Sequence, residues 1–267
     1  MSIVISIPTH LEREKVLSKP FIYYPIEKCA STLLSNNICL AVSKLEVDTN
    51  YSGFNLYNDS IRNFYEKTFG QILLKEHEPG SVLPLAHTLH YYYSKFFLKN
   101  AFQFTFVRNP LDRFVSAWIH GSLTKHVSDF PNCFDKKMSK DEMISTFNKF
   151  VDSFFGINDN LKGSPHFGRY LSCLPRNLED LDFIGKLETF NDDLEYVINT
   201  VWEHDKEISS RLVKRLIRES DKNLISDSPH NTKHYRNGIQ LDEFYSDDSD
   251  ALVRNYYREE MEIFGYD

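Results

Sequence analysis

Short apolar runs and longer stretches with helical periodicity follow one another along this chain. Two runs flanked by turn-forming residues, Phe21 to Tyr24 and Phe102 to Val107, predict buried strands, and Gln71 to Leu74 and Phe183-Ile184 predict two more. Apolar residues at helical spacing predict helices over residues 31–44, 59–69, 110–120, 140–154, 190–202, 206–219 and 247–264. Strands that alternate with helices favour an α/β fold, in which helices flank a central parallel sheet on both faces.

The helix after the strand 102–107 has the most distinct boundaries. Asn109 can cap it, and Pro110 suits the first helical position, where its missing N–H would be unpaired in any case. We expect Gly121 to end this helix. Apolar residues recur along it at i, i+3, i+4, i+7 and i+8, which predicts one buried face. The residues of this face are Leu111, Phe114, Val115, Trp118 and Ile119.

Composition indicates a folded protein without a general affinity for polyanions. Hydrophobic residues make up 41% of the 267 residues and charged residues 26%, which is typical of a domain with a packed core. No repeat, low-complexity tract or linker interrupts the chain, so we predict a single domain over residues 1–267. The formal net charge of −7 provides no global positive field for nucleic acid or an anionic lipid surface. An anionic ligand therefore needs a local site.

The cysteines and the N-terminus predict the compartment. The four cysteines lie far apart without a CxxC pair, which argues against a zinc ribbon or a disulfide framework and favours reduced thiols. The N-terminal segment lacks a basic start, and no stretch approaches the ~20 apolar residues of a membrane span. We expect a cytoplasmic protein without a transmembrane segment.

Two loops are candidate ligand sites, because ligands of parallel sheets bind beyond the carboxyl ends of the strands. The first, residues 25–32, joins a strand to a helix. Its backbone N–H groups and the side chain of Lys28 suit an anion. It lacks the GxxxxGK[ST] pattern of a Walker A loop, so an ordinary turn capped by Ser31 is the alternative.

The second loop, residues 108–110, adds a guanidinium and a hydroxyl. Arg108 stands at the end of its strand, and Ser116 follows inside the next helix. This pair suits a terminal phosphate, since a guanidinium binds two phosphate oxygens at once and the hydroxyl adds a third contact. Arg113 is expected to be a surface ion-pair or support residue.

Together these segments resemble the type-2 carbohydrate sulfotransferases, which include the heparan 2-O- and chondroitin 4-O-sulfotransferases. PIEKCASTLL is similar to the family's loop for the 5′-phosphosulfate, and RNPLDRFVS matches its 3′-phosphate motif RxPxxRxxS. DFIGKLETFNDDLEYV and YYREEMEIFGYD resemble its later strand-helix and C-terminal patterns, in the expected order. The resemblance implies a P-loop-like sulfotransferase fold. A bacterial enzyme would explain why the anchor and disulfides of eukaryotic members are not visible.

The resemblance implies transfer of the sulfuryl group of 3′-phosphoadenosine 5′-phosphosulfate (PAPS) to a hydroxyl of a carbohydrate or glycolipid acceptor, without a metal. Lys28 would stabilise the leaving phosphate. The loop 226–238 matches a family loop that closes over the cofactor, although a flexible, solvated loop is an equal alternative. The expected donor-binding residues are Lys28, Cys29, Ala30, Ser31, Thr32, Arg108, Ser116, Lys233 and Arg236.

His87 is the expected general base, because the segment AHTLHYYYSKF is similar to the family segment with the catalytic histidine. An imidazole also accepts a proton near neutral pH. His90, one helical turn further on, is the alternative base. A metal site built from these two histidines and Glu76 matches no zinc spacing.

Two further residues have open roles. His166 lies in SPHFGRYLSC, which resembles a family segment except that Arg169 and Tyr170 replace its Gln pattern. Glu188 either orients a basic residue or the acceptor, or is a structural carboxylate at a helix start. Two other functions compete with sulfuryl transfer, namely a nucleotide-dependent kinase-like enzyme and a non-catalytic binding module on the same fold.

Overall fold

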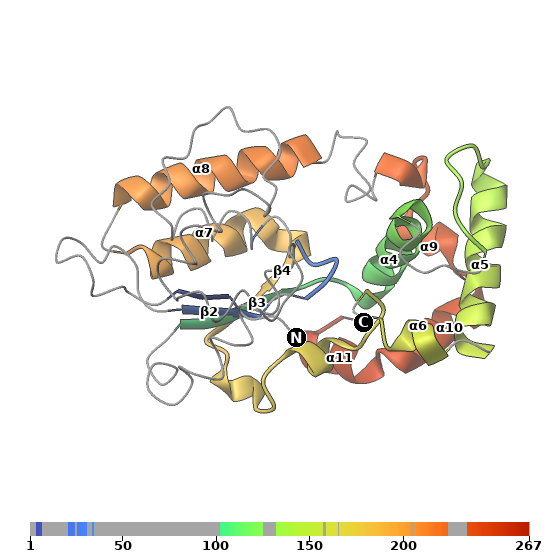
Figure 1. Cartoon of the computed structure of the whole chain (residues 1–267), viewed down its shortest axis with the longest axis horizontal. Helices are drawn as coiled ribbons and strands as arrows, with labels where there is room; N and C mark the ends of the chain where they lie inside the picture. Colours follow the sequence, from blue (N-terminus) through green and yellow to red (C-terminus); the bar gives the residue numbers. More distant parts are fainter. Residues whose placement is uncertain are drawn as a thin grey trace, which may run out of the picture. The chain divides into compact units, whose positions relative to one another are not determined.

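The computed structural model describes two compact units of the chain (Figure 1). One is built from parts of Met1–Ile26, Ala30–Phe106 and Cys173–Glu219, and the other from parts of Glu27–Cys29, Val107–Ser172 and Ser220–Asp267. Single-domain organisation stays a prediction. The predicted strand 71–74, the predicted helix 59–69 and nearly all of the predicted helix 31–44 lie outside the described residues. The structure describes residues 4–6, 21–24, 26–30, 34, 102–124, 132–156, 159–164, 166–203, 206–223 and 234–266.

The first unit contains a small sheet with the strand order β1-β2-β3-β4. The edge strand β1 runs antiparallel to β2, whereas β2 runs parallel to β3 with Phe21 opposite Phe102. The predictions for 21–24 and 102–107 are confirmed, and the predicted strand at 183–184 extends to Lys186. The strands are β1 (Val4–Ser6), β2 (Phe21–Tyr24), β3 (Phe102–Val107) and β4 (Phe183–Lys186).

Aromatic side chains form the core of this unit. Phe21 and Tyr23 on β2, and Phe104 and Phe106 on β3, are buried at alternate positions, so they share one face of the sheet. A Cβ on Gly185 of β4 would lie 2.6 Å from the ring of Phe106, so only glycine allows this close approach.

Helices α7 (Phe190–Val201) and α8 (Lys206–Asn223) follow and lie over the sheet (Figure 1). The apolar residues of α7 and Leu212 of α8 pack against the aromatic core. Two 3-10 turns, Leu178–Asp180 and Leu187–Thr189, flank β4. The arrangement is compatible with an α/β sulfotransferase fold, and the P-loop-like detail stays a prediction.

The second unit is helical and packs around α4 (Pro110–Thr124). All five residues of the predicted apolar face of α4 are buried, and the ring of Phe114 lies among the rings of six other aromatic residues. Polar side chains of α4 are buried as well, so the helix is enclosed on nearly all sides. The other elements are α5 (Lys140–Gly156), α6 (Asp159–Lys162), α9 (Leu241–Phe244), α10 (Asp247–Tyr256), α11 (Arg258–Phe264) and the 3-10 turns Tyr170–Cys173 and His234–Arg236.

Some predicted helix bounds are wrong. Helix α8 runs to Asn223 rather than to residue 219. Helix α4 continues through Gly121 to Thr124, because burial of its last turn outweighs the roughly 1 kcal/mol that glycine costs inside a helix. The predicted helix 247–264 breaks at Tyr257, which leaves the helical conformation. The buried hydroxyl of Tyr257 donates a hydrogen bond to the carbonyl of Phe167. This contact holds the side chain in the core, where the two helices α10 and α11 meet.

Candidate active site

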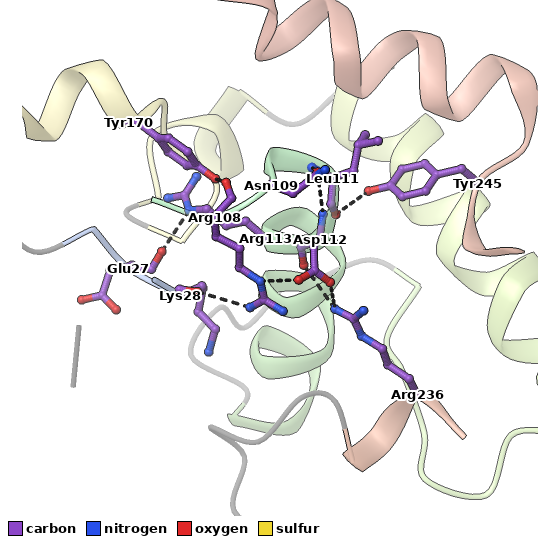
Figure 2. Close-up of polar contacts among 10 residues, drawn as sticks. All are labelled: Glu27, Lys28, Arg108, Asn109, Leu111, Asp112, Arg113, Tyr170, Arg236 and Tyr245. Carbon is purple, nitrogen blue, oxygen red and sulfur yellow. Dashed lines mark hydrogen bonds and ion pairs between the residues drawn. The ribbon is translucent and has the colours of Figure 1, made fainter. Parts of the chain in front are cut away.

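The turn after β2 has an unusual backbone. Lys28 and Ala30 adopt positive φ angles of 67° and 58°, a left-handed conformation that costs a non-glycine residue roughly 1–2 kcal/mol. Two guanidiniums hold this turn in place. Arg108 Nη1 donates to the carbonyl of Lys28 at 3.3 Å, and Arg113 Nε donates to the carbonyl of Glu27 at 2.9 Å (Figure 2). Strain of this kind persists where the surroundings determine it, as at ligand sites.

The start of α4 positions Arg108. The side-chain oxygen of Asn109 accepts the N–H groups of Leu111 at 2.9 Å and Asp112 at 3.4 Å, which confirms the predicted cap. The hydroxyl of Tyr170 donates to the carbonyl of Arg108 at 2.7 Å. Arg108 is 5% exposed, so these contacts fix a buried guanidinium at the end of β3, next to Lys28.

Asp112 connects Arg108 to Arg236 (Figure 2). Its Oδ2 accepts Arg108 Nε at 2.5 Å, and its Oδ1 forms an ion pair with Arg236 Nη2. Burial opposes ionisation of the carboxyl, but the charges of Arg108 and Arg236 and their hydrogen bonds lower its pKa to about 2. Two arginines that sequence analysis assigned to the donor are thus brought together by a carboxylate that it did not assign.

The position of Arg113 corrects one alternative. It is fully buried rather than a surface ion-pair residue, and it has the support role instead. Besides the carbonyl of Glu27, it donates to the carbonyl of Gly168 at 2.8 Å, and its guanidinium lies 4.5 Å from the centre of the Tyr170 ring. Arg113 therefore fastens the turn 27–30 to the segment that contains Gly168.

Lys28 is electrostatically unusual. Burial, followed by the charge of Arg108, lowers its pKa to about 7, although Glu27 acts in the opposite direction. A bound anion would favour the protonated amine and raise this pKa again. The neighbouring Cys29 is buried, and the carbonyl of Ala30 accepts the N–H of Leu34 at 2.9 Å. That bond has helical spacing, in agreement with the strand-to-helix loop that the sequence predicts.

Other predicted residues are placed only in part. Ser116 is buried in α4, and Glu188 lies in the 3-10 turn before α7, where its alternatives stay open. Arg169 Nε forms an ion pair with the buried carboxylate of Glu260 at 3.0 Å, which is a structural contact. Five predicted residues lie outside the described residues, so their roles stay predictions. They are Ser31, Thr32, His87, His90 and Lys233.

Sequence reasoning missed three residues of this site. Asp112 had a signal, because an acid four positions after Arg108 on a helix face favours an ion pair. Tyr170 was noted only as a replacement in a family segment. Tyr245, whose hydroxyl donates to the carbonyl of Leu111 at 2.8 Å, had no local signal because the two residues lie 134 positions apart.

A sequence model of a family described as the sulfotransferase family matches residues 18–267, nearly the whole chain. The chain belongs to the sulfotransferase family. This finding confirms the resemblance to the type-2 group and identifies the protein as a transferase of sulfuryl groups. The comparisons with curated proteins and with solved structures gave no match. In the described ranges, no helix of this sulfotransferase has the length and apolarity to cross a membrane.

Proposed function

We propose that this sulfotransferase transfers the sulfuryl group of PAPS to a hydroxyl of a carbohydrate or glycolipid acceptor. The observation that carries the proposal is the cluster of four basic residues around the turn 27–30 and the start of α4, in a chain with a net charge of −7. A donor with a phosphosulfate at one end and a phosphate at the other needs such a concentration of positive charge. The four residues are Lys28, Arg108, Arg113 and Arg236.

The residues fit such a donor in two respects. Arg236 Nε is buried and has no acceptor among the described residues, so this N–H can receive an oxygen from a ligand. The turn 27–30 is held through the carbonyl groups of Glu27 and Lys28, which leaves the amine of Lys28 to a ligand. In our proposal the 5′-phosphosulfate binds at residues 28–32.

The 3′-phosphate of the donor binds at Arg108 and Ser116 in this proposal. Arg236 and Lys233 contribute from the loop 226–238. Support comes from the shared carboxylate of Asp112, which keeps Arg236 next to Arg108.

The donor supplies an activated sulfuryl group, and the protein supplies position, charge and a base. We assign proton removal to His87, with His90 as the alternative. As His87 accepts the proton, the acceptor oxygen bonds to sulfur and the bond between sulfur and the phosphate oxygen breaks. Lys28 stabilises the negative charge that develops on the leaving phosphate. A cytoplasmic location is part of this proposal, and the wide spacing of the four cysteines in the sequence, without a CxxC pair, supports it.

The test is sulfate transfer from labelled PAPS to a panel of glycans and glycolipids. We expect labelled acceptor to form with the wild type and not in its absence. Phosphate transfer from ATP under the same conditions would instead indicate a kinase. Donor binding without any labelled product or donor hydrolysis would indicate a non-catalytic module.

A further inference from the structure

Asp112 lies at the centre of the basic cluster, yet the proposed function gives it no role. Its two carboxylate oxygens bind different arginines, Arg108 from the end of β3 and Arg236 from the 3-10 turn His234–Arg236 (Figure 2). Arg236 Nη2 also donates to the backbone carbonyl of Asp112 at 3.3 Å. The side chain of Arg108 is 6% exposed, that of Arg236 is 10% exposed and that of Asp112 is 17% exposed. Water therefore screens these charges poorly.

Two buried guanidiniums repel each other unless an anion lies between them. Burial has the largest effect on the pKa of Arg236 and lowers it. The charge of Asp112 raises this pKa, and the charge of Arg108 lowers it. Asp112 is therefore the counter-ion that allows the two arginines to lie together. Loss of this carboxylate would leave two buried positive charges without compensation.

The contacts to Asp112 leave other donors of both arginines available. A guanidinium carries five N–H donors in a rigid planar fork. Arg108 uses Nε for Asp112 and Nη1 for the carbonyl of Lys28, and Arg236 uses Nη2 for Asp112. In the part of the chain that the structure describes, Arg236 Nε is buried without an acceptor. A buried donor of this kind indicates an acceptor that comes from a ligand.

We propose that Asp112 is a positioning residue for one phosphate monoester. Its carboxylate binds Arg108 through Nε and Arg236 through Nη2. Arg236 Nε and the remaining amino groups of the two guanidiniums then bind the ligand. The inference rests on the proposed function, in which the ligand group is the 3′-phosphate of the donor. Asp112 itself does not contact the phosphate. It fixes the two cations that do.

The experiment compares wild type, Asp112→Asn, Asp112→Glu and Asp250→Asn by calorimetry with 3′-phosphoadenosine 5′-phosphate and adenosine 5′-phosphate. Asp250 is a matched control, since it pairs with Arg254 four residues further on in α10 at 2.6 Å. We expect Asp112→Asn to weaken binding of the 3′-phosphorylated nucleotide about 10- to 100-fold, the loss of one charge-assisted hydrogen bond. Adenosine 5′-phosphate should change less than about twofold, Asp112→Glu should retain most of the affinity, and Asp250→Asn should equal wild type.

Kinetics separate positioning from a general structural effect. Asp112→Asn should raise KM for the donor with kcat nearly unchanged, because the 3′-phosphate takes no part in bond cleavage. A folded Asp112→Asn protein that binds the 3′-phosphorylated nucleotide as tightly as wild type, or more tightly, overturns the proposal. If circular dichroism shows that Asp112→Asn does not fold, the affinity of Arg236→Lys for the 3′-phosphorylated nucleotide is the test. This variant retains the positive charge and removes Nε. Unchanged affinity in that variant overturns the proposal.

Failure of the proposed function gives a different pattern. In that case the wild type itself does not distinguish the two nucleotides. Inorganic phosphate then tests Asp112 independently of any nucleotide. Phosphate should raise the melting temperature of wild type and Asp250→Asn and have a smaller effect on Asp112→Asn, and an equal shift in all three proteins contradicts the positioning role.

Discussion

Arg108 donates a hydrogen bond to the carbonyl of Lys28, 80 positions earlier in the chain. Arg108 thereby holds Lys28 in its left-handed conformation, and both residues belong to the helical unit. In the proposed function these residues serve opposite ends of the donor. Their contact joins the residues proposed for the two ends of the donor through a single guanidinium.

Lys28 should matter more for the transition state than for binding. Lys28→Ala is expected to lower turnover by about two or more orders of magnitude with a smaller loss of donor affinity, because its charge is needed most when the phosphate leaves. Steady-state rates and calorimetry on the same preparation measure both effects. Lys149→Ala in α5 is the control, and full turnover in Lys28→Ala would exclude the role.

The depressed pKa of Lys28 predicts a pH effect on binding. In the free protein Lys28 loses its proton as the pH rises through about 7, whereas a bound anion favours the protonated form. Above pH 7 donor binding should therefore take up a proton, and affinity should fall as pH rises. Calorimetry in buffers with different ionisation enthalpies measures this uptake. Proton uptake that persists in Lys28→Arg would mean that another group titrates.

His87 should determine the rising part of the rate profile. His87→Ala is expected to lower transfer by about 10² to 10⁴, the usual contribution of a positioned base, with folding and donor binding intact. The wild-type kcat should rise with pH through the histidine range, because the neutral imidazole is the active form. His90→Ala should be far milder. The reverse result in two folded variants would make His90 the base.

Arg113 should contribute to stability through the backbone groups that it joins. Arg113→Met leaves the carbonyls of Glu27 and Gly168 without this donor and should lower the free energy of unfolding by about 2–4 kcal/mol. Urea unfolding measures the change. Arg254→Met removes a half-exposed ion pair and should change stability by less than about 1 kcal/mol. A similar change in the free energy of unfolding for the two variants would contradict the support role of Arg113.

Local rules predicted the parts of the fold that local interactions determine. Short apolar runs between turn-forming residues predicted β2 and β3, and Asn109 with Pro110 predicted the start of α4. The end of α4 and the break at Tyr257 depend on burial and on a contact to Phe167, 90 positions away. Periodicity contains no information about such contacts.

The same limit applies to the site. The sequence predicted that Lys28 and Arg108 lie at one edge of the sheet, since parallel strands end together there, and the structure brings them into contact. It did not predict that Arg113 is buried, because the carbonyl groups that bind it lie 86 and 55 positions away. Nor did it predict that Asp112 joins Arg108 to Arg236, which lies 124 positions further along the chain.

The most direct test of the proposed donor is a calorimetric titration of the wild type with 3′-phosphoadenosine 5′-phosphate, adenosine 5′-phosphate and ATP with magnesium. In the proposed function, only a nucleotide with phosphates at both ends occupies both proposed anion sites, residues 28–32 and the pair Arg108 and Ser116. We therefore predict that the first nucleotide binds at least about tenfold more tightly than the other two, the difference that one charge-assisted hydrogen bond supplies. Equal affinity for the three nucleotides, or tighter binding of ATP, would contradict a site built for PAPS.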